Sequence, residues 1–247
     1  MFESVANFFY IILYQPLFNS LVALYNYIPG HDFGIAIIVL TVVIRFILFP
    51  TSVKAVKSQR SLQKLQPQIQ EVQKKYKDDK EKQAKEILDL YKREKINPFS
   101  GLLLALMQLP ILIALYRVFW GGLNPKGLTA LYSFILNPGH INPLFLHIID
   151  LSKPNMVIAI LAGLVQYFQT KMLLPETGPS ASGQSKEADF SQVMQKQMVY
   201  FFPVFTVIIL INLQSALGLY WVVSGLFSIV QQYFIFKKHG KPETIKA

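Results

Sequence analysis

Long apolar runs alternate with charged or polar segments along this 247-residue chain. A transmembrane helix needs about 20 mostly apolar residues, and four runs meet that length: 33–53, 99–120, 156–174 and 216–236. A fifth segment, 196–213, contains a shorter apolar run that needs a locally thinned bilayer or support from neighbouring helices. The pattern predicts an all-α, polytopic membrane protein with five transmembrane helices.

The segment between the first two apolar runs, residues 54–97, has a helical pattern of its own. Apolar positions follow a 3-4-3-4 spacing at Leu62, Leu65, Ile69, Val72 and Tyr76. The stripe resumes after Asp78 and Asp79, at Ala84, Leu88 and Tyr91. Such a narrow seam is typical of helices that pack against each other, so we predict an antiparallel helical hairpin. A hairpin with no binding partner is the alternative.

The remaining segments connect or flank the spans. Residues 121–155 form a loop, and residues 175–195 are rich in Gly, Ser and Pro, which predicts a flexible linker. Residues 237–247 are a short basic tail. In residues 1–30, Asn7, Gln15, Asn19 and Asn26 recur on one side of a predicted helix. We expect an interfacial amphipathic helix rather than a cleaved signal peptide, with a full additional span as the alternative.

Charge distribution predicts the orientation. The 54–95 loop carries thirteen Lys or Arg and seven acids, whereas residues 1–44 contain no Lys or Arg. By the positive-inside rule, the hairpin and the C-terminus are cytoplasmic and the N-terminus faces outward. Charged residues make up 15% of the chain, below the roughly 25% of soluble domains. The net charge of +10 is concentrated in a membrane-tethered hairpin, which argues against sequence-specific nucleic-acid binding.

Arg45 lies in the middle of the first predicted span, with Thr41 one turn earlier on the same face. An arginine at that depth costs roughly 3 to more than 10 kcal/mol, so it must face the bundle interior. A buried ion pair, an anionic ligand or a water-filled cavity would each satisfy it. Because the other spans contain no Asp or Glu, no acidic partner exists within the membrane, and a hydrated, positively polarised cavity is favoured.

Neutral polar residues on other spans could line that cavity. They occur at helical spacing, so each set occupies one face of its helix. The candidates are Gln108, Gln166, Gln169, Thr170, Trp221, Ser224, Ser228 and Gln231. Interhelical hydrogen bonding without a functional role is the alternative for any one of these side chains.

Catalytic and metal chemistry find no support in the sequence. The spans contain no Ser-His-Asp grouping, no HExxH motif and no Walker-type glycine loop. The four histidines lie in predicted loops or the tail without metal-ligand spacing, and there are no cysteines. We therefore expect no cofactor, no metal and no enzymatic reaction.

Four stretches together resemble the YidC-type membrane protein insertase family, whose relatives also serve mitochondria and chloroplasts. They are FGIAIIVLTVVIRFILFP, LQPQIQEVQKKYKDD, LYKREKINPFSGLLLALMQLPILIALYRV and GLYWVVSGLFSIVQQ. The resemblance implies an ATP-independent insertase and chaperone with five core helices around a hydrophilic groove. It also implies groove roles for Arg45, Thr41, Tyr220 and Trp221, and for one of Gln166, Gln169 and Thr170.

The implied partners are nascent membrane proteins and membrane lipid, with the ribosome, the signal recognition particle or its receptor, and the Sec translocon. We expect the chain to lack the large outer domain, the lipoprotein cysteine and the long C-terminal tail found among family members. We expect a short bacterial form in the cell (inner) membrane. A small-solute transporter or anion channel is the alternative function, although we find no internal repeat of the kind transporters show.

Overall fold

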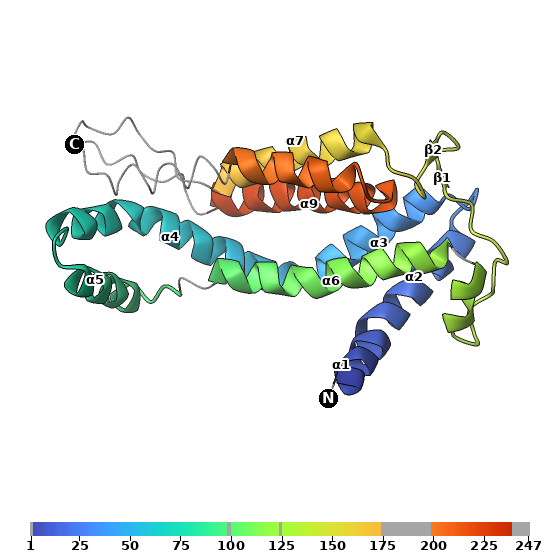
Figure 1. The fold of residues 1–247 in the computed structure, drawn as a ribbon, viewed down its shortest axis with the longest axis horizontal. Coiled ribbons are helices and arrows are strands. Elements are labelled where there is room, and N and C mark those ends of the chain that lie inside the picture. Colours follow the sequence, from blue (N-terminus) through green and yellow to red (C-terminus); the bar gives the residue numbers. More distant parts are fainter. Residues whose placement is uncertain (1, 98–99, 124, 174–198, 239–247) are drawn as a thin grey trace.

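The computed structural model describes residues 2–97, 100–123, 125–173 and 199–238. Figure 1 shows an elongated molecule with a helical bundle at one end and a helical hairpin, α4 (Phe49–Lys75) and α5 (Lys80–Arg93), at the other. In the described part, three helices are long and apolar enough to cross a membrane, or four if one bent pair counts as a span. The predicted all-α membrane architecture is confirmed, and the count of five spans stays a prediction.

The N-terminal segment is helical through three consecutive elements. They are α1 (Phe2–Phe9), a π-helix η1 (Tyr10–Tyr14) and α2 (Gln15–Tyr27). Buried Asn19 donates to the carbonyl oxygen of Ala130 and accepts from the backbone N–H of Tyr132. Part of the polar side of this predicted interfacial helix therefore contacts the loop of residues 121–155. Ala6–Tyr27 also passes the length and composition test for a membrane span.

The first predicted span is broken. α3 (Phe33–Ile47) begins after Asp32, whose carboxylate accepts from the Ile35 N–H at 2.9 Å, and it ends before Leu48. α4 then starts in a direction 66° away. Pro50 lies in the first turn of α4, where its missing N–H is tolerated but cannot continue the α3 ladder. Residues 49–53, predicted as the end of the span, form the first turns of α4, and the bounds of the span stay a prediction.

Helices α4 and α5 pack through a small apolar cluster. Leu65, Ile69 and Leu90 are buried there, with Ile87, Tyr91 and Ile96 packed around them. The predicted α4 seam is correct at Leu65 and Ile69. The α5 stripe through Ala84 and Leu88 is wrong, because both side chains are exposed. The buried face of α5 runs instead through Ile87, Leu90 and Tyr91.

The chain returns through α6 (Ser100–Gly122), which runs beside α4 and reaches the end of the bundle away from the hairpin (Figure 1). The loop that follows contains a 3-10 turn, η2 (Pro125–Ala130), and a two-stranded antiparallel ribbon, β1 (Leu144–Phe145) with β2 (Ile149–Asp150). Asp32 accepts from the Leu146 N–H at 2.6 Å. That hydrogen bond fastens the ribbon to the start of α3.

The C-terminal half supplies α7 (Met156–Leu173), the shorter apolar helix Val199–Leu210, and α9 (Ser215–Lys238). α9 packs against α7, α3, α4 and α6, so it is the central wall of the bundle. A Cβ on Gly163 would lie 2.4 Å from Cγ2 of Val207, which shows how closely helix 199–210 approaches α7. The predicted linker 175–195 and residues 239–247 of the predicted tail lie outside the described residues.

Candidate functional site

Arg45 contacts α9 through a single serine. The guanidinium donates from Nε to the Ser224 hydroxyl at 2.7 Å, and Nη2 donates to the same oxygen. Thr41, one turn away, is buried and donates to the carbonyl oxygen of Ile37 in its own helix. Arg45 therefore meets a neutral hydroxyl, and among the described side chains no carboxylate pairs with its charge.

The same helix–helix seam continues toward the hairpin. Ser52 and Gln231, both buried, form the next hydrogen bond, with Gln231 Nε2 2.7 Å from Ser52 Oγ. Beyond them, Arg60 donates to the carbonyl oxygen of Phe236 at 3.1 Å, and its guanidinium carbon lies 4.8 Å from the centre of the Phe236 ring. α3 and α4 are thus joined to α9 by a series of polar contacts.

Ser52 and Arg60 were missed by the sequence analysis. One signal could have identified Ser52: it follows Arg45 by seven residues, and Gln231 follows Ser224 by seven. Within the single helix predicted for residues 33–53, two polar positions two turns apart therefore match two on the last predicted span, although the structure breaks the first helix between them. Arg60 lies within the segment assigned to the hairpin, and its contact with a backbone carbonyl leaves no sequence pattern.

Other predicted residues meet α9 from different directions. Gln108 of α6 donates to the hydroxyl of buried Tyr220. On the α7 side, Trp221 Nε1 donates to Gln166 Oε1 at 3.1 Å. The Gln166 amide in turn donates to Thr170 Oγ1 at 3.4 Å.

The other two predicted residues on these helices are Gln169 and Ser228, and neither contacts Arg45 through a hydrogen bond in the structure. Gln169 is half-buried near Gly225, where an added Cβ would lie 3.5 Å from Gln169 Oε1. The hydroxyl of buried Ser228 donates to the carbonyl oxygen of Ser224, one turn back in α9. The structure therefore brings Arg45 to Ser224, Gln108 to Tyr220, and Gln166 to both Trp221 and Thr170. A water-filled groove among these residues stays a prediction.

The side chains at this site supply charge and hydrogen bonds. It offers one cation and a set of neutral donors and acceptors. In the described ranges, no cluster of three or more His, Asp or Glu could hold a metal ion. Gln232 adds a buried Oε1 without a hydrogen-bond partner in the structure. An arginine fork among neutral groups is suited to binding a carboxylate or another anion.

Residues 23–242 match the protein family described as 60Kd inner membrane protein. The chain is 33% identical over 207 residues to the membrane protein insertase YidC of Fusobacterium nucleatum subsp. nucleatum, covering 84% of this chain and 87% of that relative. It is 34% identical over 228 residues to the membrane protein insertase YidC of Syntrophus aciditrophicus, covering 92% of this chain and 36% of the relative.

Among solved structures, the fold is similar to that of an active YidC insertase crystallised with its first transmembrane domain resolved. The TM-score is 0.56 at 26% identity, and the match covers 90% of this chain and 46% of the crystallised one. The chain thus spans most of the Fusobacterium relative, little more than a third of the Syntrophus relative and under half of the crystallised protein.

Proposed function

The chain belongs to the YidC family of membrane protein insertases, and on that premise we propose that Arg45 is the point at which a substrate segment is held during insertion. The observation that carries the proposal is that the Arg45 guanidinium donates to the neutral hydroxyl of Ser224 and to no carboxylate among the described residues. A serine hydroxyl satisfies the donors without neutralising the charge. The guanidinium is therefore ready to exchange that serine for an anionic group.

A carboxylate is the group that fits best. Arginine and a carboxylate form two parallel, charge-assisted hydrogen bonds, which are roughly twice as strong as neutral ones. The surrounding helices reduce the dielectric screening, so the attraction exceeds its value in bulk water. A short acidic segment of a substrate would be stabilised here, whereas lipid would exclude it. Its apolar helix would then partition into the bilayer, with no covalent bond made or broken.

Ser52, Gln231 and the polar side chains of α6 and α7 would extend this polar surface into a groove. Thr41, Gln108, Gln166, Gln169, Thr170, Tyr220, Trp221, Ser224 and Ser228 are the residues that we assign to it. Buried neutral amides and hydroxyls can hydrogen bond either to one another or to a passing backbone, so they tolerate many substrate sequences. Such tolerance is required of a protein that handles diverse chains.

The α4–α5 hairpin, in our proposal, lies in the cytoplasm, with the N-terminus outside and the C-terminus inside. The excess of Lys and Arg between residues 54 and 95 supports this orientation. Its exposed basic surface would make the first contact with nascent chains, the ribosome, the signal recognition particle or its receptor, and the Sec translocon. The small-solute transporter alternative is not favoured, because both the curated relatives and the solved relative are insertases.

A paired assay tests the proposal. Proteoliposomes containing the full chain receive either a small two-span substrate with an acidic outer segment or the same substrate with that segment neutralised, and flux of small anions is measured in parallel. Arg45→Glu should slow insertion of the acidic substrate by roughly tenfold more than that of the neutral one. Arg45→Lys keeps the positive charge, so it should retain most of the preference for the acidic substrate over the neutral one. Lys153→Glu, at an exposed loop position, is the control.

Equal effects of Arg45→Glu on both substrates would contradict a charge-based role for Arg45. Anion flux that depends on Arg45, without insertion, would identify a transporter or channel instead.

A further inference from the structure

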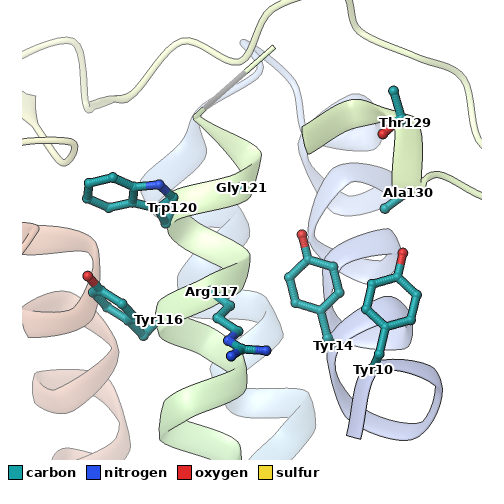
Figure 2. A pocket seen from close by; sticks show the side chains of 8 residues that line it. All are labelled: Tyr10, Tyr14, Tyr116, Arg117, Trp120, Gly121, Thr129 and Ala130. Carbon is teal, nitrogen blue, oxygen red and sulfur yellow. The ribbon is translucent and has the colours of Figure 1, made fainter. Parts of the chain in front are cut away.

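Another arginine, Arg117, lies at the end of the bundle opposite the hairpin, beside a cavity of about 530 Å³. The cavity lies between α6, η1 and η2, and it contains none of the proposed groove residues. Its principal side chains are Tyr10, Tyr14, Tyr116, Arg117, Trp120 and Thr129. Figure 2 shows the Arg117 guanidinium extending from α6 toward the two tyrosines of η1.

Arg117 has no acidic partner within the described residues. Its side chain contacts an aromatic ring instead, because the guanidinium carbon lies 5.7 Å from the centre of the Phe9 ring. A cation–π contact leaves the five N–H donors of the guanidinium without acceptors. The Arg117 side chain is exposed, so an anionic group at the surface of the membrane can reach these donors directly.

Arg117 lies near the end of α6, where a helix that spans the membrane would reach the lipid headgroups. It precedes the last residue of the helix, Gly122, by five residues, or roughly 7–8 Å along the axis. Tyr116 and Trp120 project from α6 on the other side of Arg117 in Figure 2 and are 39% and 58% exposed. Exposed tyrosine and tryptophan are typical of the boundary between hydrocarbon and headgroups.

The opposite wall of the cavity supplies hydroxyl groups. Tyr10 and Tyr14 stack with ring centres 5.2 Å apart, and both hydroxyls point in the direction of η2 (Figure 2). The two tyrosines begin and end the π-helix, an irregularity that is often found at binding sites. Gly121 leaves room for Tyr14, because a Cβ there would lie 2.7 Å from the tyrosine oxygen.

We propose that this cavity binds the phosphodiester headgroup of an anionic phospholipid, with Arg117 on the phosphate and tyrosine hydroxyls on the remaining oxygens. A free phosphate would share the charge chemistry, but the exposed aromatic rim fits a ligand that also has acyl chains. The volume lies within the range of small-ligand pockets, roughly 300–1,000 Å³. Bound lipid would fix the N-terminal helix against α6, independently of the proposed groove.

The test uses the full chain, purified in detergent and depleted of lipid, and native mass spectrometry to measure the binding of phosphatidylglycerol. Arg117→Gln should raise the dissociation constant of the tightest site by roughly tenfold, the loss expected for a charge-assisted hydrogen bond. Arg117→Lys should have a smaller effect. Lys153→Gln removes a cation from the same end of the bundle without touching the cavity, and it should leave the affinity unchanged.

Two further measurements use the wild-type chain, so they do not depend on whether a variant folds. They distinguish a lipid phosphate from a free phosphate ion. Diacylglycerol, which lacks the phosphate, should bind to the wild-type chain at least tenfold more weakly than phosphatidylglycerol. Inorganic phosphate at matched concentration should not displace the lipid. Equal binding of diacylglycerol, full displacement by inorganic phosphate, or an Arg117→Gln affinity equal to that of the wild type would each overturn the proposal. Tyr10→Phe, which removes only a hydroxyl, should weaken lipid binding by a few fold.

Discussion

At the residue scale, the contact between Arg45 and Ser224 joins a charged donor to a neutral acceptor. The guanidinium offers two donors to one hydroxyl oxygen, so the serine is the fixed acceptor for a half-buried cation when no substrate is present. Ser228, one turn along α9, uses its hydroxyl differently, because it donates to a carbonyl of its own helix. The two serines therefore form a matched pair for mutation.

Ser224→Ala should lower the free energy of unfolding by about 1.5–3 kcal/mol, because it removes a hydrogen-bond acceptor from a charged group. Ser228→Ala should cost only about 0.5 kcal/mol, the typical value for a neutral hydrogen bond within a membrane bundle. Denaturation in detergent, followed by tryptophan fluorescence, measures both. Similar losses for the two variants would show that Ser224 does not support Arg45.

Individual site residues were predictable where they interrupt an apolar helix. Arg45, Ser224 and Gln166 stand out because polar groups are costly in a membrane. The sequence could not pair them, since the partners are separated by as many as 179 residues and a helical stripe does not identify the helix that it faces. Thr41 also stood out, yet its hydroxyl bonds within α3, as Ser and Thr often do in helices.

At the element scale, the hairpin shows how a short helix can be assigned the wrong face. The spacing Ala84–Leu88–Tyr91 and the observed set Ile87–Leu90–Tyr91 both satisfy a helical period. In α5, where charged residues dominate, apolar positions are too few to fix the phase. Only packing against Leu65 and Ile69 of α4 decides it.

Leu90→Ala should destabilise the hairpin by about 2–5 kcal/mol, because Leu90 is 2% exposed and its removal leaves a cavity. Leu88→Ala, at a position 55% exposed, should change the stability by less than about 0.5 kcal/mol. Amide hydrogen exchange over α5 measures the two effects directly. Faster exchange in Leu88→Ala than in Leu90→Ala would contradict the observed packing.

The turn before α7 should give the bundle a pH dependence. The hydrogen bond from the Ser152 hydroxyl lowers the pKa of Asp150, and the Ser152 N–H and Lys153 contribute as well. This turn also accepts hydrogen bonds from the N-terminus of α9, since the Ser215 hydroxyl donates to the carbonyl oxygen of Lys153 at 2.7 Å. Protonation of Asp150 therefore weakens a junction between two helices.

Because the folded-state pKa of Asp150 lies below the unfolded value of about 3.9, its stabilising contribution is complete above that pH. The contribution is lost as the pH falls through the lowered folded-state value. The melting temperature of the wild type should therefore drop more steeply below about pH 4 than that of Asp150→Asn. Parallel melting curves for the two proteins over this range would exclude the contribution.

At the scale of the whole molecule, the apolar runs predicted where most helices lie, but they did not predict the break between α3 and α4. α6, α7 and α9 start and end close to the predicted bounds. The break at Leu48 was hidden because hydropathy is continuous from residue 33 to residue 53, although Pro50 marks the position. For the N-terminal segment, the composition permits either a membrane span or a surface helix. The hydrogen bond of Asn19 to Ala130 joins residues far apart in the chain, so the sequence could not predict it.

The proposed groove is a property of the bundle, and the absence of cysteines allows a direct test of it. Single cysteines at Thr41, Gln166 and Ser224 should react with a charged methanethiosulfonate reagent that is added on the side of the hairpin. Half-buried Gln166 should react fastest, because Thr41 and Ser224 are 1% and 3% exposed and react only when the helices part. Ile37→Cys, in the apolar core at 0% exposure, is the unreactive control. Bound substrate should slow all three reactions, whereas protection of all three as complete as at Ile37 would exclude a hydrated groove.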